Sequence, residues 1–534
     1  MPHSAVDKNR LNCLYYKVPN LSVLAWINVR ERINLGRCSC SAFDSQIPIM
    51  STTQLTRPAP PEATHPSCAL TPEFLADLRV GYVMTAGDRA CHNAVTNNAV
   101  NSLVLNRDVL RGNDGHFNHR IKSNGITDQK NSGRCWMFAG LNVLRPQVIR
   151  NNRMVEFEFS TAYLQFWDKM EKSNLYLESI IELRDADFLD RDWEMVNKWT
   201  LEDGGWWNYL VGLVEKYGAV PLSAMTETHG STHTQTLNHI LGRLLRTQAV
   251  RIMKQHQDGT GIEALRAGKI EALREVYRFL VINLGEPPVD FEWRYKLRKA
   301  PHRTGDEAAA EMLTVAEEDL TAPERHTPQS FYKKYIGNSL ADFVCLYNDP
   351  HNELDRHYSF DRTRNIVGND CMHFVNIDSA PMKEIAKASI LANEPVWFAV
   401  NMDFDQSAKH GLMEHQLFDY ESLFGIDLTV SKADRTHFHA GASGHAMALM
   451  GVDLAEDGRP VKWLVENSHG DDTGDKGRWT LHDKWFDEHV YTIIVHKRHV
   501  PTEILKRFDE EATVLPAWYP GAQGIRFEGG STNA

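Results

Sequence analysis

The order of its periodic segments is the feature that most restricts the fold of this chain of 534 residues. Patterns typical of amphipathic helices occupy the first part, over residues 71–80, 135–145, 163–185, 208–217 and 236–285. Short apolar runs rich in Val, Ile and aromatic residues, typical of strands, follow beyond residue 340, over 343–348, 396–402, 445–453, 462–468 and 491–497. Helices that precede strands, instead of alternating with them, predict an α+β architecture.

Capping residues and prolines help to define the ends of two of these helices. Thr71 is a good N-cap for the first one, and Pro72 suits its first helical position. The helix that starts at Cys135 contains Pro146, which lacks the N–H that a helix interior needs. We therefore expect the second helix to end or kink near Pro146.

Composition and charge exclude several classes of protein. The net charge is −12 and no long basic run occurs, so we do not expect a nucleic-acid partner. The eight cysteines form no CxxC pair, which argues against a zinc ribbon and favours a reducing cytoplasmic compartment. No run of eighteen apolar residues occurs, so no membrane span is predicted, and the apolar run at 21–29 is short for a signal peptide and has no cleavage-site pattern after it.

The segment QKNSGRCWMF (129–138) places Cys135 where a loop becomes a helix. A helix start carries partial positive charge, which favours the thiolate over the thiol, and Arg134 adds a cation beside it in the sequence. Gln129 offers an amide donor that, with the Cys135 backbone N–H, can form an oxyanion hole. A buried structural cysteine is the alternative interpretation of this segment taken alone.

Two later segments supply partners for a nucleophilic thiol. GHAMALMGVD places His445 at the start of a strand, and KWLVENSHGDD places Asn467 at the end of the next one. A Cys–His pair needs a third group to orient the imidazole, and an Asn side chain can accept from its ring N–H. The order Cys, His, Asn along the chain is that of papain.

The blocks QKNSGRCWMF, GHAMALMG and WLVENSHGDDTGDKGRW resemble the three active-site blocks of the bleomycin hydrolase and aminopeptidase C family of papain-like cysteine peptidases. Further blocks agree between about Leu70 and Pro520, among them DGGWWNYLVGLVEKYGAVP, LGEPPVDFEW and RHVPTEILKRFDEEATVLPAW. The resemblance implies the following site: Cys135 as nucleophile, His445 as general base and acid, Asn467 as orienting residue, Gln129 as oxyanion donor, and Gly204 and Gly205 as the backbone that pairs with substrate. It implies peptide substrates and no metal or organic cofactor.

The same resemblance implies a papain-like fold with a helical lobe, a β-rich lobe and a large helical insertion. His445 follows Cys135 by 310 residues (445 − 135), against about 130–150 in papain and the cathepsins, so an insertion must lie between them. We expect five parts: an N-terminal extension (1–69, disordered or absent from the mature protein), a helical lobe (70–224), the insertion (225–340), a β-rich lobe (341–520) and a tail (521–534). The family also implies a homohexamer.

Two features depart from the family pattern. His469 stands where the family has a Trp that covers the Asn–His contact, so we expect this residue to make the contact wetter and more sensitive to pH. The tail GAQGIRFEGGSTNA is longer than the family's short tail, which lies in the cleft and restricts the enzyme to aminopeptidase activity. An open cleft would give an endopeptidase or acyl-transfer enzyme, and a triad disabled by His469 would give a catalytically silent oligomeric binding protein.

Overall fold

The computed structural model describes residues 69–123, 125–199, 202–298, 320–337, 339–402, 405–522 and 524. The chain divides into two compact units after Val83. The first unit contains one described helix, α1 (Pro72–Gly81), in which Thr71 Oγ1 accepts a hydrogen bond from the Phe74 N–H at 3.1 Å. The predicted cap is therefore confirmed, whereas the prediction for residues 1–69 lies almost entirely outside the described residues.

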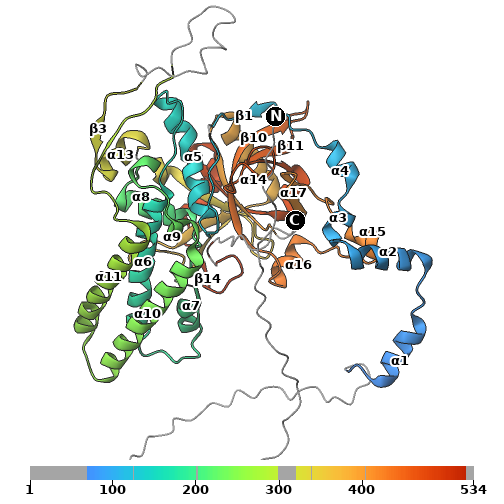
Figure 1. Cartoon of the computed structure of the whole chain (residues 1–534), viewed down its shortest axis with the longest axis horizontal. Coiled ribbons are helices and arrows are strands. Elements are labelled where there is room, and N and C mark those ends of the chain that lie inside the picture. The colour runs from blue at the N-terminus through green and yellow to red at the C-terminus, as the bar shows by residue number, and fades with distance from the viewer. Residues whose placement is uncertain are drawn as a thin grey trace, which may run out of the picture. The chain divides into compact units, whose positions relative to one another are not determined.

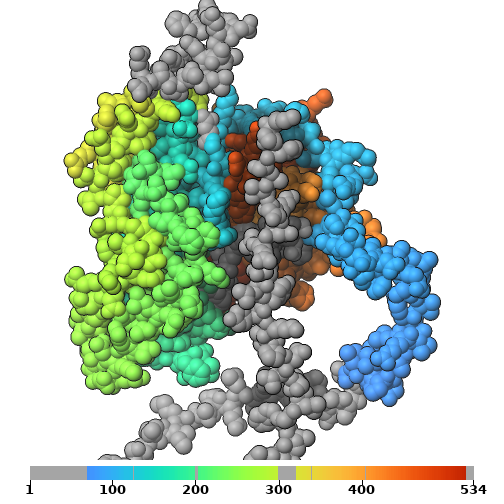
Figure 2. All heavy atoms as spheres, in the orientation of Figure 1, coloured from blue at the N-terminus to red at the C-terminus, as the bar shows by residue number. Residues whose placement is uncertain are grey.

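In the second unit, the helices between Cys135 and Tyr335 occupy one side in Figure 1 and Figure 2. Their bounds are α5 (Cys135–Asn151), α6 (Thr161–Glu182), α7 (Arg191–Trp199), α8 (Trp207–Tyr217), α9 (His229–Thr232), α10 (Thr234–Gln257), α11 (Ile262–Leu284) and α13 (Pro328–Tyr335). Helices α6, α10 and α11 lie side by side because each presents a buried apolar face to the others. The sequence predicted α5, α6 and α8 to within a few residues at most ends, and it predicted one helical region over 236–285 where the structure has α10 and α11.

Helix α5 does not end at Pro146, contrary to one of the two expectations for that residue, and continues to Asn151. A proline in a helix interior costs about 3 kcal/mol. Nearly every side chain of α5 is buried, and the helix packs against α8 and against strands β7 and β10, so burial offsets this cost. Gly140 allows the close approach of α8, because a Cβ there would lie 2.2 Å from Leu210 Cδ2.

Three short helices before Cys135 were not predicted: α2 (Ala86–Asn97), α3 (Val100–Val104) and α4 (Arg107–Gly112). The N-cap of α2, Thr85, forms a capping box with Asp88. These helices lie along residues 417–424, where the Tyr420 hydroxyl donates to Asn101 Oδ1 at 2.6 Å. Partners more than three hundred residues away in sequence therefore hold this segment, which explains why local patterns did not reveal it.

Most strands form one mixed sheet in the order β14-β5-β6-β4-β13-β7-β10-β11-β12-β9-β8, with β1 paired to β10. Five of its strands match the predicted ones: β4 (Phe343–Tyr347), β7 (Val396–Val400), β10 (His445–Leu454), β11 (Pro460–Glu466) and β13 (Val490–His496). The other strands of this sheet are β1 (His119–Arg120), β5 (Arg356–Phe360), β6 (Met372–Asn376), β8 (Gln406–Ser407), β9 (Leu412–Met413), β12 (Arg478–His482) and β14 (Thr513–Leu515). The longest helices lie before about residue 340 and most strands lie after it, which confirms the α+β prediction.

The central strands carry the core that joins the sheet to α5. Every residue of β7 is buried, and β7 pairs antiparallel with both β10 and β13. The indole N–H of Trp397 on β7 donates to the backbone carbonyl of Trp136 on α5 at 3.1 Å. Helices α14 (Ser379–Leu391), α15 (Tyr420–Phe424), α16 (Lys432–His437), α17 (Asp483–His489) and α18 (Thr502–Leu505) complete the sheet-bearing part.

The segment predicted as a helical insertion contains α9, α10, α11 and α13 among its described residues, together with a small sheet of β2 (Phe291–Trp293) and β3 (Glu324–His326). It is therefore mainly helical, and the boundaries of the five predicted parts stay predictions. Across the described residues, none of the helices combines the length and the apolar character needed to cross a bilayer.

Candidate active site

Cys135 is the first residue of α5 and its side chain has no solvent exposure. The backbone N–H groups of the first helical turn have no partner within the helix, and they leave a partial positive charge where the thiol is attached. Such a position favours a thiolate. The prediction that Cys135 stands at a helix start is confirmed.

His445 and Asn467 are joined by a hydrogen bond of 2.9 Å between the imidazole Nε2 and the amide Oδ1. His445 is the first residue of β10 and Asn467 follows the last residue of β11, and these two strands are antiparallel neighbours. Asn467 Oδ1 also accepts the Ser468 N–H at 2.8 Å, so this atom is an acceptor and Nε2 is the donor. In the neutral ring, Nδ1 then carries the lone pair that can take a proton.

Burial, together with the neighbouring His469, lowers the pKa of His445 to about 3, although the hydrogen bond with Asn467 acts in the opposite direction. The resting imidazole is therefore neutral near pH 7. A nearby anion, such as a thiolate, would favour the charged form of this ring.

Gln129 connects the loop before Cys135 to the residue after Asn467. Its backbone N–H donates to the Ser468 carbonyl at 2.8 Å, and the Ser468 hydroxyl donates to Gln129 Oε1 at 2.6 Å. Gln129 Nε2 donates to the Ser132 carbonyl at 2.6 Å and has a second hydrogen for an oxyanion near Cys135. These bonds fix the amide in one orientation, as an oxyanion donor requires.

Gly204 and Gly205 lie beside the start of α5. A Cβ on Gly205 would stand 2.5 Å from the Trp136 ring, so only glycine allows the backbone to lie this close. The Trp136 indole N–H donates to the Asp203 carbonyl at 2.8 Å, and the Gly133 N–H donates to Asp203 Oδ2 at 3.0 Å. The segment expected to pair with substrate is therefore held by hydrogen bonds from a residue before Cys135 and a residue after it.

The described end of the C-terminal tail lies against this glycine segment. A Cβ on Gly524 would be 3.1 Å from the Gly205 nitrogen, closer than ordinary van der Waals contact, so the two backbones lie close together. The rest of the tail, from Ile525 onward, is outside the described residues.

Comparison with known proteins places the chain in a family. Residues 69–522 match the Peptidase C1-like family. The chain belongs to this family. It is 34% identical to aminopeptidase C of Streptococcus thermophilus over 85% of this chain and 98% of the relative, and 33% identical to bleomycin hydrolase of Rattus norvegicus over 80% and 93%.

The crystal structure of PepW from Lactobacillus rhamnosus HN001 superposes with a TM-score of 0.79 at 32% identity, covering 85% of this chain and 99% of that one. Aminopeptidase W of Lactobacillus delbrueckii is also similar, at 32% identity over 84% of this chain. These comparisons confirm the expected papain-like α+β fold and the predicted family.

One departure of this chain from the family pattern, His469, covers the His445–Asn467 pair. Its ring stacks on that of His445, with centroids 5.1 Å apart and planes 28° apart. His445 and Asn467 have no solvent exposure, so the expectation of a wetter contact was wrong: the imidazole is large enough to shield the pair. Burial lowers the pKa of His469, and Asp128 partly opposes this shift, so the ring charges only in acid.

Arg134 contributes less to the thiol than its place in the sequence indicated. Its Nη1 lies 3.0 Å from Glu227 Oε1, and its Nε donates to Ser132 Oγ at 2.9 Å. The guanidinium also lies over the Phe138 ring, 5.0 Å from its centroid. Because a carboxylate already compensates its charge, the start of α5 is the main source of positive potential at Cys135.

Asp203, which the sequence did not indicate as a site residue, holds the glycine segment in place. Besides the Gly133 N–H, its carboxylate binds Lys169 Nζ at 2.6 Å and Asn238 Nδ2 at 2.9 Å. Burial raises the pKa of Asp203, but Lys169 and the hydrogen bonds outweigh burial and hold it well below its ordinary value. The only local signal was an acidic residue directly before two glycines and two tryptophans.

Proposed function

We propose that this chain is a cysteine aminopeptidase that removes N-terminal residues from peptides. The observation that carries the proposal is the joined set of His445, Asn467 and Gln129 around the helix that begins at Cys135. A second observation, the contact of Gly524 with Gly205, favours cleavage next to the N-terminus. Curated relatives named aminopeptidase C and bleomycin hydrolase support the same activity.

The first half of the reaction forms a thioester. The Cys135 thiolate attacks the carbonyl carbon of the first peptide bond, a C–S bond forms, and the carbonyl electrons move to the oxygen. The Cys135 N–H and Gln129 Nε2 donate to this oxyanion. His445, charged when it takes the thiol proton on Nδ1, returns that proton to the leaving amine as the C–N bond breaks.

The second half releases the amino acid. His445 is neutral again after the amine leaves, and its Nδ1 takes a proton from a water molecule that attacks the thioester carbonyl. The tetrahedral oxyanion uses the same two donors, and its collapse breaks the C–S bond. Asn467 holds the imidazole in one orientation through both steps, since it keeps the proton on Nε2.

The tail accounts for cleavage at the N-terminus. A substrate that extended past its first residue toward the non-primed side would need the backbone of Gly204 and Gly205, as in papain. Gly524 lies against Gly205 and blocks part of this backbone. The peptide therefore has room for only one residue before the bond that is cleaved. The endopeptidase alternative requires the tail to leave Gly205.

One peptide with a free or an acetylated N-terminus tests this proposal. We expect the free peptide to lose its first residue and the acetylated peptide to be cleaved at least tenfold more slowly. A chain shortened after Tyr519, which removes the tail contact, is expected to reduce this difference. Equal cleavage of both peptides by the full chain would exclude the aminopeptidase.

We also propose that the protein is a cytoplasmic homohexamer. Among the described cysteines, Cys91, Cys345 and Cys371 are free thiols, which suits a reducing compartment. Exposed apolar side chains on α10 and α11 favour a subunit contact there, namely those of Ile240, Val250, Ile262, Ile270 and Ile282. Light scattering on the purified chain tests the hexamer, and a monomeric mass at micromolar concentration would contradict it.

A further inference from the structure

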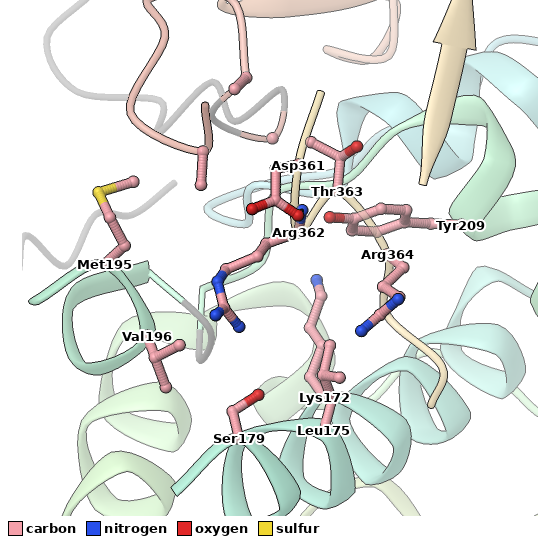
Figure 3. A pocket seen from close by; sticks show the side chains of 13 residues that line it. Lys172, Leu175, Ser179, Met195, Val196, Tyr209, Asp361, Arg362, Thr363 and Arg364 are labelled. Carbon is pink, nitrogen blue, oxygen red and sulfur yellow. The ribbon is translucent and has the colours of Figure 1, made fainter. Parts of the chain in front are cut away.

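A cavity of about 100 Å³ lies beside the glycine segment and is bordered by α6, α7, α8, the loop after β5 and the C-terminal tail (Figure 3). The residues that matter for its chemistry are Lys172, Tyr209, Asp361, Arg362, Arg364 and Gly524. Figure 3 shows the cationic ends of Lys172, Arg362 and Arg364 directed toward this space, next to the Tyr209 ring.

The cavity is connected to the proposed active site. Lys172 Nζ donates to the Gly204 carbonyl at 2.6 Å and lies 5.6 Å from the centroid of the Trp136 ring. Gly524 borders the cavity and also contacts Gly205. A ligand here would therefore touch the tail and the lysine that holds the glycine segment.

Two of the three cations that border the cavity form ion pairs. Lys172 forms an ion pair with Asp168 at 2.7 Å, and Arg362 forms one with Asp192 at 2.8 Å. Burial lowers the pKa of the Arg362 guanidinium, but Asp192, with a smaller contribution from Asp361, outweighs burial and raises it. Arg364 has no ion pair with any residue that the structure describes.

The loop that carries Arg364 is fixed by its own hydrogen bonds. The Asp361 N–H donates to the Leu515 carbonyl at 2.8 Å, and the Thr363 hydroxyl donates to the Phe360 carbonyl at 2.6 Å. Asn208 Nδ2 donates to the Thr363 carbonyl at 2.9 Å. An anion would therefore meet a guanidinium on a backbone that is already ordered, which lowers the entropy lost on binding.

We propose that this cavity binds a carboxylate group through the guanidinium of Arg364, with the Tyr209 hydroxyl as a further donor. A guanidinium presents two parallel N–H groups that match the two oxygens of a carboxylate. The carboxylate belongs either to an acidic peptide substrate, in which case the inference rests on the proposed aminopeptidase function, or to a free carboxylate ligand.

Binding is tested with sodium acetate and sodium succinate, titrated against sodium chloride at constant ionic strength. Wild type and the variants R364K, R364Q and R356Q are compared by thermal unfolding; Arg356 is an exposed arginine on the preceding strand β5. We expect either carboxylate to raise the unfolding temperature of wild type and R356Q, with about tenfold weaker binding in R364Q and an intermediate value in R364K. No response in wild type, or the same response in R364Q, would overturn the proposal.

Two matched reporters with an N-terminal Glu or Gln then identify the source of the carboxylate. If it comes from the substrate, the Glu-to-Gln ratio of kcat/KM is about tenfold lower in R364Q than in R356Q. If the ligand is free, acetate changes the rates on both reporters in R356Q and on neither in R364Q. If the aminopeptidase proposal is wrong but the carboxylate site exists, neither reporter is hydrolysed, while carboxylate still raises the unfolding temperature of wild type.

Discussion

The imidazole of His445 donates from Nε2 to Oδ1 of Asn467 across 2.9 Å, and neither side chain has any solvent exposure. In the proposed mechanism, Nδ1 is then the nitrogen that exchanges protons with the thiol, the leaving amine and water. In that mechanism Asn467 does not contact substrate and acts as a positioning residue for His445.

Replacing Asn467 with alanine should lower kcat by about 10²-fold, because the imidazole then loses its fixed tautomer and orientation. KM should change less, since Asn467 does not contact substrate. Steady-state kinetics on an aminoacyl reporter measures both constants. Asn142→Ala removes another buried asparagine, bonded to Thr127, and serves as the matched control. Equal losses of kcat in the two variants would mean that Asn467 is only a packing residue.

Replacing Gln129 with alanine should lower kcat by about 10²-fold or more, which is typical for the loss of one oxyanion donor. Gln165→Ala is the control, because Gln165 is also buried but its amide bonds to other groups. Its Oε1 accepts from Arg134, and its Nε2 donates to the Ser231 carbonyl. Thermal unfolding of both variants separates loss of structure from loss of rate. A fall in kcat of less than threefold for Gln129→Ala, with a normal unfolding temperature, would remove Gln129 from the oxyanion hole.

Replacing His469 with tryptophan should extend activity to lower pH. Burial lowers the pKa of His469, so it charges in acid, and a charge 5.1 Å from the His445 ring opposes the imidazolium that protonates the leaving amine. Tryptophan cannot charge, so the acid limb of kcat/KM should move down by about half a pH unit or more. The measurement is a pH profile from 4.5 to 8, with exposed His437→Trp as control. Superimposable profiles for His469→Trp and wild type would show that His469 does not titrate in catalysis.

The buried imidazole of His489 should make the stability of the folded chain depend on pH, separately from catalysis. Burial, with Arg435 and Lys432 nearby, lowers the pKa of His489 to about 3 in the folded chain, whereas its ordinary value is 6.5. The unfolded chain takes up the proton first, so this contribution is present above about pH 6.5 and is lost as the pH falls toward 3.

His489→Gln should therefore reduce the slope of unfolding free energy against pH by about 1.4 kcal/mol per pH unit between pH 6 and 4. Urea titrations at several pH values measure this slope, and the exposed His437→Gln serves as control. If His489→Gln and wild type lose stability at the same rate in acid, the ring of His489 is not buried in its neutral form.

The proposed catalytic residues could be selected from the sequence because each lies at the end of a strongly patterned element. Cys135 is the first residue of a helix, His445 is the first residue of a strand and Asn467 follows a strand, and all three are buried. The order of helices and strands likewise predicted the α+β fold. Local pattern and spacing carry this information directly.

The contacts that join these residues could not be predicted, since they connect segments far apart in the chain. Ser468 and Gln129 are separated by 339 residues, and Asp203 fixes Gly133 over a separation of 70. Pro146 was misjudged for a related reason, because burial of α5 outweighs a local rule. Arg364 gave no signal in the sequence, because only the fold places it in the lining of the cavity with Lys172 and Tyr209.

The most direct test of the central claim is Cys135→Ala against wild type, on an aminoacyl reporter and with iodoacetamide labelling followed by mass spectrometry. We predict that wild type hydrolyses the reporter, loses activity as iodoacetamide modifies Cys135, and is protected by substrate. Cys135→Ala should fold with the same unfolding temperature and show at least a 10³-fold lower kcat, about 4 kcal/mol in activation free energy. Reporter hydrolysis that persists in Cys135→Ala, or is unaffected when Cys135 is fully alkylated, would contradict the proposed thiol mechanism.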